Sequence, residues 1–270
     1  IIVLVVILTL PATAYFVLQN NKVQTYLIQK IANTVSDNLD AKFQIGAVDY
    51  RFFNKIVLKD LYIEDQSEDS LLFAKEVIAK LQKVDRENKV ISLKDISIIN
   101  AKFYLNKPDS LEPINLKFLT DKIKRDSLKT KPRWEINFSN IDMHQSIFRF
   151  RTYKNLSKTY GVDFSDLICY IDELDVRNLT VQNRIVDFYI KKLKFIEQSG
   201  FQVYSLKSSM SISKQHMKFE NLRIRTPNSF LHSDSLSFLH SDFQDYQEFA
   251  NLISLDFAFL ESNVSFQDIV

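Results

Sequence analysis

The stretch that decides the fold is 56–63, which reads IVLKDLYI. Its pattern, apolar-x-apolar-x-Asp/Asn-apolar-x-apolar, recurs along the chain at intervals of 35 to 47 residues. The further copies are 91–98 (ISLKDISI), 136–143 (INFSNIDM), 174–181 (LDVRNLTV), 217–224 (MKFENLRI) and a shorter one at 264–269 (VSFQDI). An internal repeat of this kind indicates one structural unit that is used several times.

The alternation of apolar and other residues within each copy is typical of a β-strand with one apolar face. In a regular strand the second apolar pair would fall on the opposite face, because it begins three positions, an odd offset, after the end of the first pair. A bulge at the Asp or Asn restores the face. These residues suit a bulge because they tolerate left-handed backbone and hydrogen-bond to their own backbone. We therefore predict strand bends at Asp60, Asp95, Asn140, Asn178, Asn221 and Asp268.

Each of the five full copies then presents four apolar side chains on one face of the sheet. The predicted lining of this face is Ile56, Leu58, Leu61, Ile63, Ile91, Leu93, Ile96, Ile98, Ile136, Phe138, Ile141, Met143, Leu174, Val176, Leu179, Val181, Met217, Phe219, Leu222 and Ile224. An apolar face must be covered or filled. Two arrangements remain open: an open groove that binds acyl chains, or a closed β-sandwich core.

The repeat predicts a mainly β fold over 41–270, in which a long antiparallel sheet grows by the addition of strands and is expected to continue beyond residue 270. Segment 71–84 suits either a helix or a strand, and we favour a strand. The fold class is therefore an elongated, repetitive sheet whose apolar side forms a groove or a core.

The chain opens with an uncharged segment, 1–18 (IIVLVVILTLPATAYFVL). Eighteen helical residues, at about 1.5 Å each, nearly cross a hydrocarbon core of roughly 30 Å. We predict a transmembrane anchor, truncated at its start because the chain does not begin with Met. The alternative is a signal peptide cleaved after 12–14 (ATA). Residues 19–40 predict a juxtamembrane amphipathic helix, which either lies on the membrane or packs against the sheet.

Composition excludes several kinds of site. The chain has 3 glycines in 270 residues, where average usage gives roughly twenty. Because Gly46, Gly161 and Gly200 stand far apart, glycine-rich phosphate loops and the G-x-S-x-G nucleophile elbow are excluded. The net charge of +2 gives no support to a nucleic-acid binder.

Cysteine and histidine exclude further chemistry. Cys169 is the only cysteine, so neither an intrachain disulfide nor a multi-cysteine zinc site can form. The four histidines stand in no recognised metal-ligand spacing. We predict no catalytic residues, no metal site, no cofactor and no enzymatic activity.

Taken together, these features resemble the N-terminal part of the TamB/AsmA-like envelope proteins of Gram-negative bacteria, in a Bacteroidetes-like version. The resemblance is carried by the N-terminal span, the amphipathic helix and three segments. The segments are 43–65 (FQIGAVDYRFFNKIVLKDLYIED), 94–105 (KDISIINAKFYL) and 254–270 (SLDFAFLESNVSFQDIV).

The resemblance implies a single-pass inner-membrane protein with its bulk in the periplasm. It implies a sheet that curls into a half-pipe, or β-taco, whose apolar lumen carries phospholipid or another acyl-chain ligand between the inner and outer membranes. The alternative that it implies is a scaffold for outer-membrane protein translocation and assembly. The partner would then be a BamA/TamA-like barrel, bound through a C-terminal region that this sequence does not contain. No nucleic-acid partner is expected.

Overall fold

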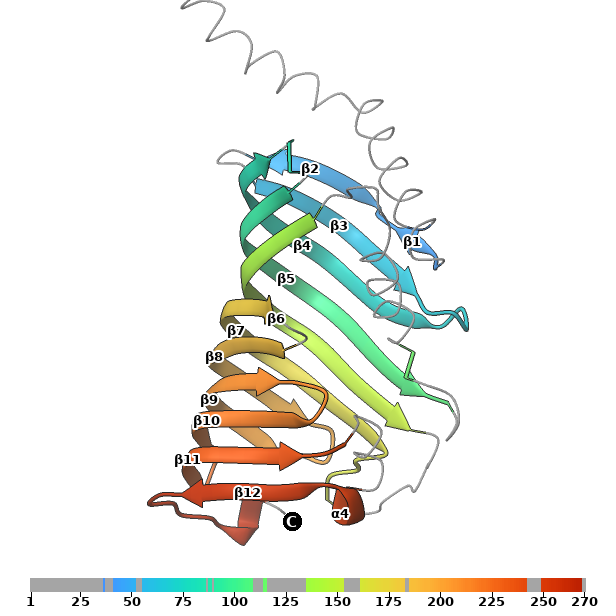
Figure 1. Ribbon diagram of the computed structural model, residues 1–270. Coiled ribbons are helices and arrows are strands. Elements are labelled where there is room, and N and C mark those ends of the chain that lie inside the picture. Colours follow the sequence, from blue (N-terminus) through green and yellow to red (C-terminus); the bar gives the residue numbers. More distant parts are fainter. Residues whose placement is uncertain are drawn as a thin grey trace, which may run out of the picture.

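The computed structural model describes residues 36, 41–51, 55–85, 87–88, 90–108, 114–115, 135–152, 161–182, 185–241 and 249–268. Within these ranges the chain forms one curved, twelve-stranded sheet that is open at both edges (Figure 1). The strands are β1 (Phe43–Gln44), β2 (Ala47–Arg51), β3 (Lys55–Glu64), β4 (Ser70–Asp85), β5 (Val90–Lys107), β6 (Glu135–Thr152), β7 (Asp166–Gln182), β8 (Ile185–Glu197), β9 (Gln202–Ile212), β10 (His216–Arg225), β11 (Phe230–Leu239) and β12 (Ser254–Phe259). Helix α4 (Phe249–Leu252) and the 3₁₀ turn η2 (Phe266–Asp268) flank β12.

The strands follow one another across the sheet in chain order, with β1 and β2 sharing β3 as their neighbour. The predicted mainly β fold, the growth by added strands and the strand at 71–84 are confirmed. The five full copies of the repeat fall in β3, β5, β6, β7 and β10. The sixth copy was wrongly predicted to be a strand: Asp268 lies in η2, where its side chain binds a neighbouring turn.

One strand pair corrects the prediction of a wholly antiparallel sheet. β5 and β6 are parallel, while the other pairs are antiparallel. Their register places the second and third copies of the repeat side by side, from Ile91 beside Ile136 to Ile98 beside Met143. Parallel pairing requires a long connection that returns the chain to the starting rim, and residues 108–134 supply its length. The alignment of two similar copies, residue by residue, accounts for this register.

The predicted anchor at 1–18 lies outside the described residues, as does all of 19–40 except Ser36. The Ser36 hydroxyl accepts a hydrogen bond from the backbone N–H of Phe43 at 3.0 Å. In the ranges given above, no helix has the length and hydropathy that crossing a bilayer requires.

Candidate apolar binding face

The bulge in β10 brings the fifth copy of the repeat onto one face. On the neighbouring strand, the Cα partners of Met217, Phe219 and Ile224 are Ile212, Met210 and Leu206. These partners are even-numbered residues of a strand with no positive φ angle, so they share a face. The register shifts between Glu220 and Arg223, where Asn221 has φ 51°. The extra residue at Asn221 therefore keeps Ile224 on the face of Met217 and Phe219.

Two further bend positions also have left-handed backbone. Asn178 has φ 56° and lies at a register shift between Arg177 and Thr180. Asp60 has φ 50° and lies opposite Gly46, whose N–H donates to the Lys59 carbonyl at 2.9 Å. A Cβ atom on Gly46 would lie 3.0 Å from the Asp60 Cβ, so a larger residue at 46 would crowd the bend.

Asp95 and Asn140 bend the chain differently, without positive φ. The β4–β5 register shifts beside Asp95, since Ala79 and Leu81 pair with Ile96 and Leu93. Asn140 is the parallel neighbour of Asp95, and its Nδ2 donates to Asp95 Oδ1 at 2.8 Å. The side-chain hydrogen bond between the two aligned parallel strands accompanies a bend that has no left-handed residue.

Two bends were not predicted, at Asn100 (φ 52°) in β5 and Gln145 (φ 49°) in β6. A signal for them exists, because 96–103 (ISIINAKF) repeats the motif with Asn100 in fifth place. In 141–148 (IDMHQSIF) a Gln takes that place. The small residues Ala101 and Ser146 follow the two bends where the motif has a large apolar residue, which concealed both copies.

These bends line up across the sheet. The register places one residue of each strand from β3 to β7, and Gly46 between β1 and β2, on a line that we call the bend line; it consists of Gly46, Asp60, Lys75, Asn100, Gln145 and Asp172. The side chains next to it converge, and Ala74, Ala101 and Ser146 are at most 2% exposed. Ala74 and Ala101 belong to a core cluster with Ile45 and Leu61. Crowding of small side chains marks this side as the inside of the bend.

The inside of the bend is continuous with an apolar row that crosses ten strands, from β2 to β11. Paired neighbours form this central apolar row, which is Val48, Leu58, Val77, Ile98, Met143, Leu174, Leu193, Leu206, Ile224 and Leu231. At about 4.8 Å between strands, the row is roughly 40 Å long. Each of its side chains is only half-buried. The row joins predicted lining residues to apolar residues of the intervening strands, which the repeat did not identify.

Further apolar rows run beside the central one. Toward one rim they include Phe103 and Phe148, with ring centroids 6.1 Å apart. Toward the other rim they include Phe219 and Phe238, 5.9 Å apart. Of the predicted lining residues, Leu61, Val176 and Leu222 are buried. The side chains of Ile91, Ile136 and Val181 are outside the described part, and the others are half-buried.

The opposite face carries many charged side chains, and on its middle strands several of them are paired. Arg177 contacts Asp142 at 2.8 Å and Asp175 at 2.7 Å, and Lys194 contacts Asp172 at 2.7 Å. The hydrogen bond from Lys194 holds the pKa of Asp172 below its usual value. The two faces therefore differ in chemistry along the length of the sheet, and the apolar face is the candidate binding face.

Cys169 lies on the apolar face, beside Phe148 on the neighbouring strand. Burial raises the pKa of its thiol to about 11. The thiol is therefore protonated near neutral pH, and a protonated thiol is a poor nucleophile.

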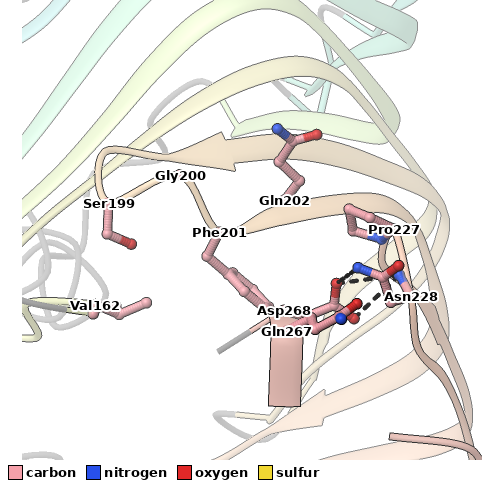
Figure 2. A pocket seen from close by; sticks show the side chains of 10 residues that line it. Val162, Ser199, Gly200, Phe201, Gln202, Pro227, Asn228, Gln267 and Asp268 are labelled. Atoms are coloured by element: carbon pink, nitrogen blue, oxygen red, sulfur yellow. Dashed lines mark hydrogen bonds between the residues drawn. The ribbon is translucent and has the colours of Figure 1, made fainter. Parts of the chain in front are cut away.

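A small cavity of about 290 Å³ lies at one rim, between the β8–β9 turn, the β10–β11 turn and η2 (Figure 2). The Asp268 carboxylate beside it accepts hydrogen bonds from Thr226 Oγ1 at 2.5 Å and from Asn228 Nδ2 at 2.9 Å. Asp268 therefore fastens the C-terminal turn to the sheet. Its carboxylate is saturated with these donors, and within the described residues no three His, Cys, Asp or Glu side chains gather as metal ligands.

The geometry can be set beside known proteins. No protein-family model matches this chain, and no curated protein is similar to it. The resemblance to the TamB/AsmA-like proteins therefore rests on the residues quoted above, and what it implies enters below as proposal.

Proposed function

We propose that this protein carries phospholipid acyl chains along the apolar face of its open sheet, between the inner and outer membranes of a Gram-negative envelope. The observation that carries the proposal is the central apolar row, which crosses ten strands without a polar residue and is partly exposed throughout. The predicted anchor at 1–18 would hold the sheet on the inner membrane, with its bulk in the periplasm.

An acyl chain needs little from such a surface. Each CH₂ group that leaves water contributes roughly 0.8 kcal/mol, and this attraction has no direction. A row that offers the same surface at every strand therefore lets a chain slide without passing a strong binding site. Cofactors and catalytic groups have no part in this function, which is transport and not catalysis.

The alternative, a closed β-sandwich core, would require the same apolar residues to be buried. A sandwich core needs a second sheet about 10 Å away that buries the apolar face. Within the described residues there is one sheet, and large side chains of the central row such as Leu174 and Leu206 remain partly exposed. This favours the open groove.

Photocrosslinking in living cells tests the proposal. A benzoylphenylalanine in place of Leu58 or Leu206 should capture phospholipid. The matched control positions are Lys59 and Lys207, the next residues along the same strands, which face the charged side. Equal capture at Leu206 and Lys207, or capture at the control positions alone, contradicts the proposal.

One observation favours a second function, as a scaffold for outer-membrane protein assembly with a BamA-like barrel. In the described residues β12 has a neighbour on one side only. Its side chains Leu255, Phe257 and Phe259 are 48%, 53% and 48% exposed. Exposed apolar edge strands pair readily with other strands. If a Phe257→Pro variant loses a copurifying barrel while lipid capture at Leu206 persists, the scaffold function is favoured.

A further inference from the structure

Four cations lie on adjacent strands at one rim of the sheet. Arg51 at the end of β2 is the Cα partner of Lys55 at the start of β3, and Lys55 is the partner of Lys80 on β4. Lys80 lies between the two β4 residues at which the β4–β5 register shifts, so it faces the bulge that contains Lys94 and Asp95, whose carboxylate accepts a hydrogen bond from Asn140. We call Arg51, Lys55, Lys80 and Lys94 the basic row. With strands about 4.8 Å apart, it extends over roughly 15 Å.

The basic row carries positive charge that the described residues do not neutralise. Like charges directly opposite each other on paired strands are destabilising. Arg51 has a carboxylate, Glu76, at 3.6 Å. Within the described part of the chain, Lys55, Lys80 and Lys94 have no ion pair. By contrast Lys59, on the same strand as Lys55, is paired with Asp49 at 2.7 Å.

The position of the row distinguishes it from the apolar binding face. Ile56 and Ala79 follow and precede two of its lysines and point to the apolar side, so the basic row points to the opposite side. The ends of β2 and β3 that carry it lie together at one rim (Figure 1). Arg51, Lys55 and Lys94 are exposed.

We propose that the basic row docks the early strands on an anionic phospholipid bilayer, with the lysine ammonium groups contacting headgroup phosphates. Basic clusters near a membrane anchor are attracted to anionic lipid. The row lies on the first strands of the sheet, which follow the uncharged segment 1–18 in the sequence. A single-stranded nucleic acid would need aromatic side chains to stack its bases, and Arg51, Lys55, Lys80 and Lys94 form an unbroken line of cations. This contact goes beyond the proposed function and does not depend on acyl-chain transport.

Amine-reactive footprinting tests the contact on the full chain in lipid nanodiscs. With phosphatidylcholine alone, Lys55, Lys80 and Lys94 should react freely. With phosphatidylglycerol added, their labelling should fall several-fold and recover in high salt, because salt screens surface charge. The control is Lys207, which also lies opposite a cation, Arg223, but on the late strands β9 and β10. Equal labelling in the two lipids, or equal protection of Lys207, overturns the proposal.

A variant and a competitor complete the test. In Lys80→Glu the row loses one of its two inner cations, and Lys55 gains a favourable neighbour, so the fold should persist. Protection of Lys55 and Lys94 by phosphatidylglycerol should fall several-fold. Unchanged protection overturns the proposal. So does protection by a short DNA in neutral nanodiscs that matches or exceeds the effect of phosphatidylglycerol, which would point to nucleic acid. Photocrosslinking at Leu206 reports the proposed transport separately, so the two proposals fail independently.

Discussion

The early strands, β3 to β7, and the late strands, β7 to β11, keep one apolar face in two different ways. In the early strands the bend is shared. In every one of these strands, the two residues that face the apolar side on either side of the bend line are three positions apart instead of two. The five pairs are Leu58 and Leu61, Val77 and Ala74, Ile98 and Ala101, Met143 and Ser146, and Leu174 and Ile171. Since all of them change together, the register does not shift there.

In the late strands each bend belongs to one strand pair. Asn178 and Asn221 each lie at a register shift, so the extra residue has no counterpart on one neighbouring strand. A shared bend crowds side chains on its inside, whereas a separate bulge leaves backbone groups that need new partners. The comparison predicts that the early strands are sensitive to side-chain volume and the late strands to backbone conformation.

The largest expected effect is at Ala101, which is 2% exposed inside the shared bend. Ala101→Leu adds three carbon atoms where Ala74 and Ser146 already converge. Overpacking of this kind destabilises by about 3 kcal/mol, measured as the free energy of unfolding in urea by circular dichroism. Ala258→Leu, on the exposed strand β12, is the matched control and should change stability by less than about 0.5 kcal/mol. Similar losses in both variants would mean that the bend is not crowded.

A smaller effect on stability is expected from removing a buried serine hydroxyl, and it should differ between the shared bend and a separate bulge. Ser146 Oγ accepts the N–H of Ala101 at 3.0 Å, at the shared bend. Ser208 Oγ donates to the carbonyl of Glu220 at 3.0 Å, beside the bulge at Asn221. Removing Ser146 Oγ leaves a buried N–H without an acceptor, while the Glu220 carbonyl loses one donor, and carbonyls tolerate this better.

Ser146→Ala should therefore destabilise by about 2 kcal/mol and Ser208→Ala by about 1 kcal/mol. Urea unfolding of the two variants measures the difference, and Ser209→Ala provides the baseline for a half-buried serine. A larger loss in Ser208→Ala than in Ser146→Ala would reverse the comparison.

The sequence predicts the separate bulges better than the shared bend, for a physical reason. A bulge is a local event, and Asn178 or Asn221 reveals it because the residue itself must tolerate left-handed backbone. The shared bend depends on register between strands that are far apart in the sequence, so Ala74 and Lys75 carry no local signal. The parallel β5–β6 pair was missed for the same reason, because the direction of pairing depends on the long connection. The repeat predicted the residues that its own copies contribute to the candidate face. The central row also contains Leu193 and Leu206, which belong to no copy of the repeat.

The smallest effect tests whether the bends at Asn221 and Asp95 differ in backbone conformation. Asn221 has φ 51°, whereas Asp95 bends without positive φ. Comparing Gly with Ala at one position removes the contribution of the original side chain. At Asn221 the Gly variant should be more stable than the Ala variant by about 1 kcal/mol, because Ala is strained in left-handed backbone and Gly is not. At Asp95 the order should reverse by about 0.5 kcal/mol, since Gly in ordinary strand backbone loses more conformational entropy on folding. Unfolding free energies of the four variants measure both differences. The same sign at both positions would mean that the chain bends by one mechanism at Asp95 and Asn221, and that the aligned Asp95 and Asn140 side chains do not replace left-handed backbone.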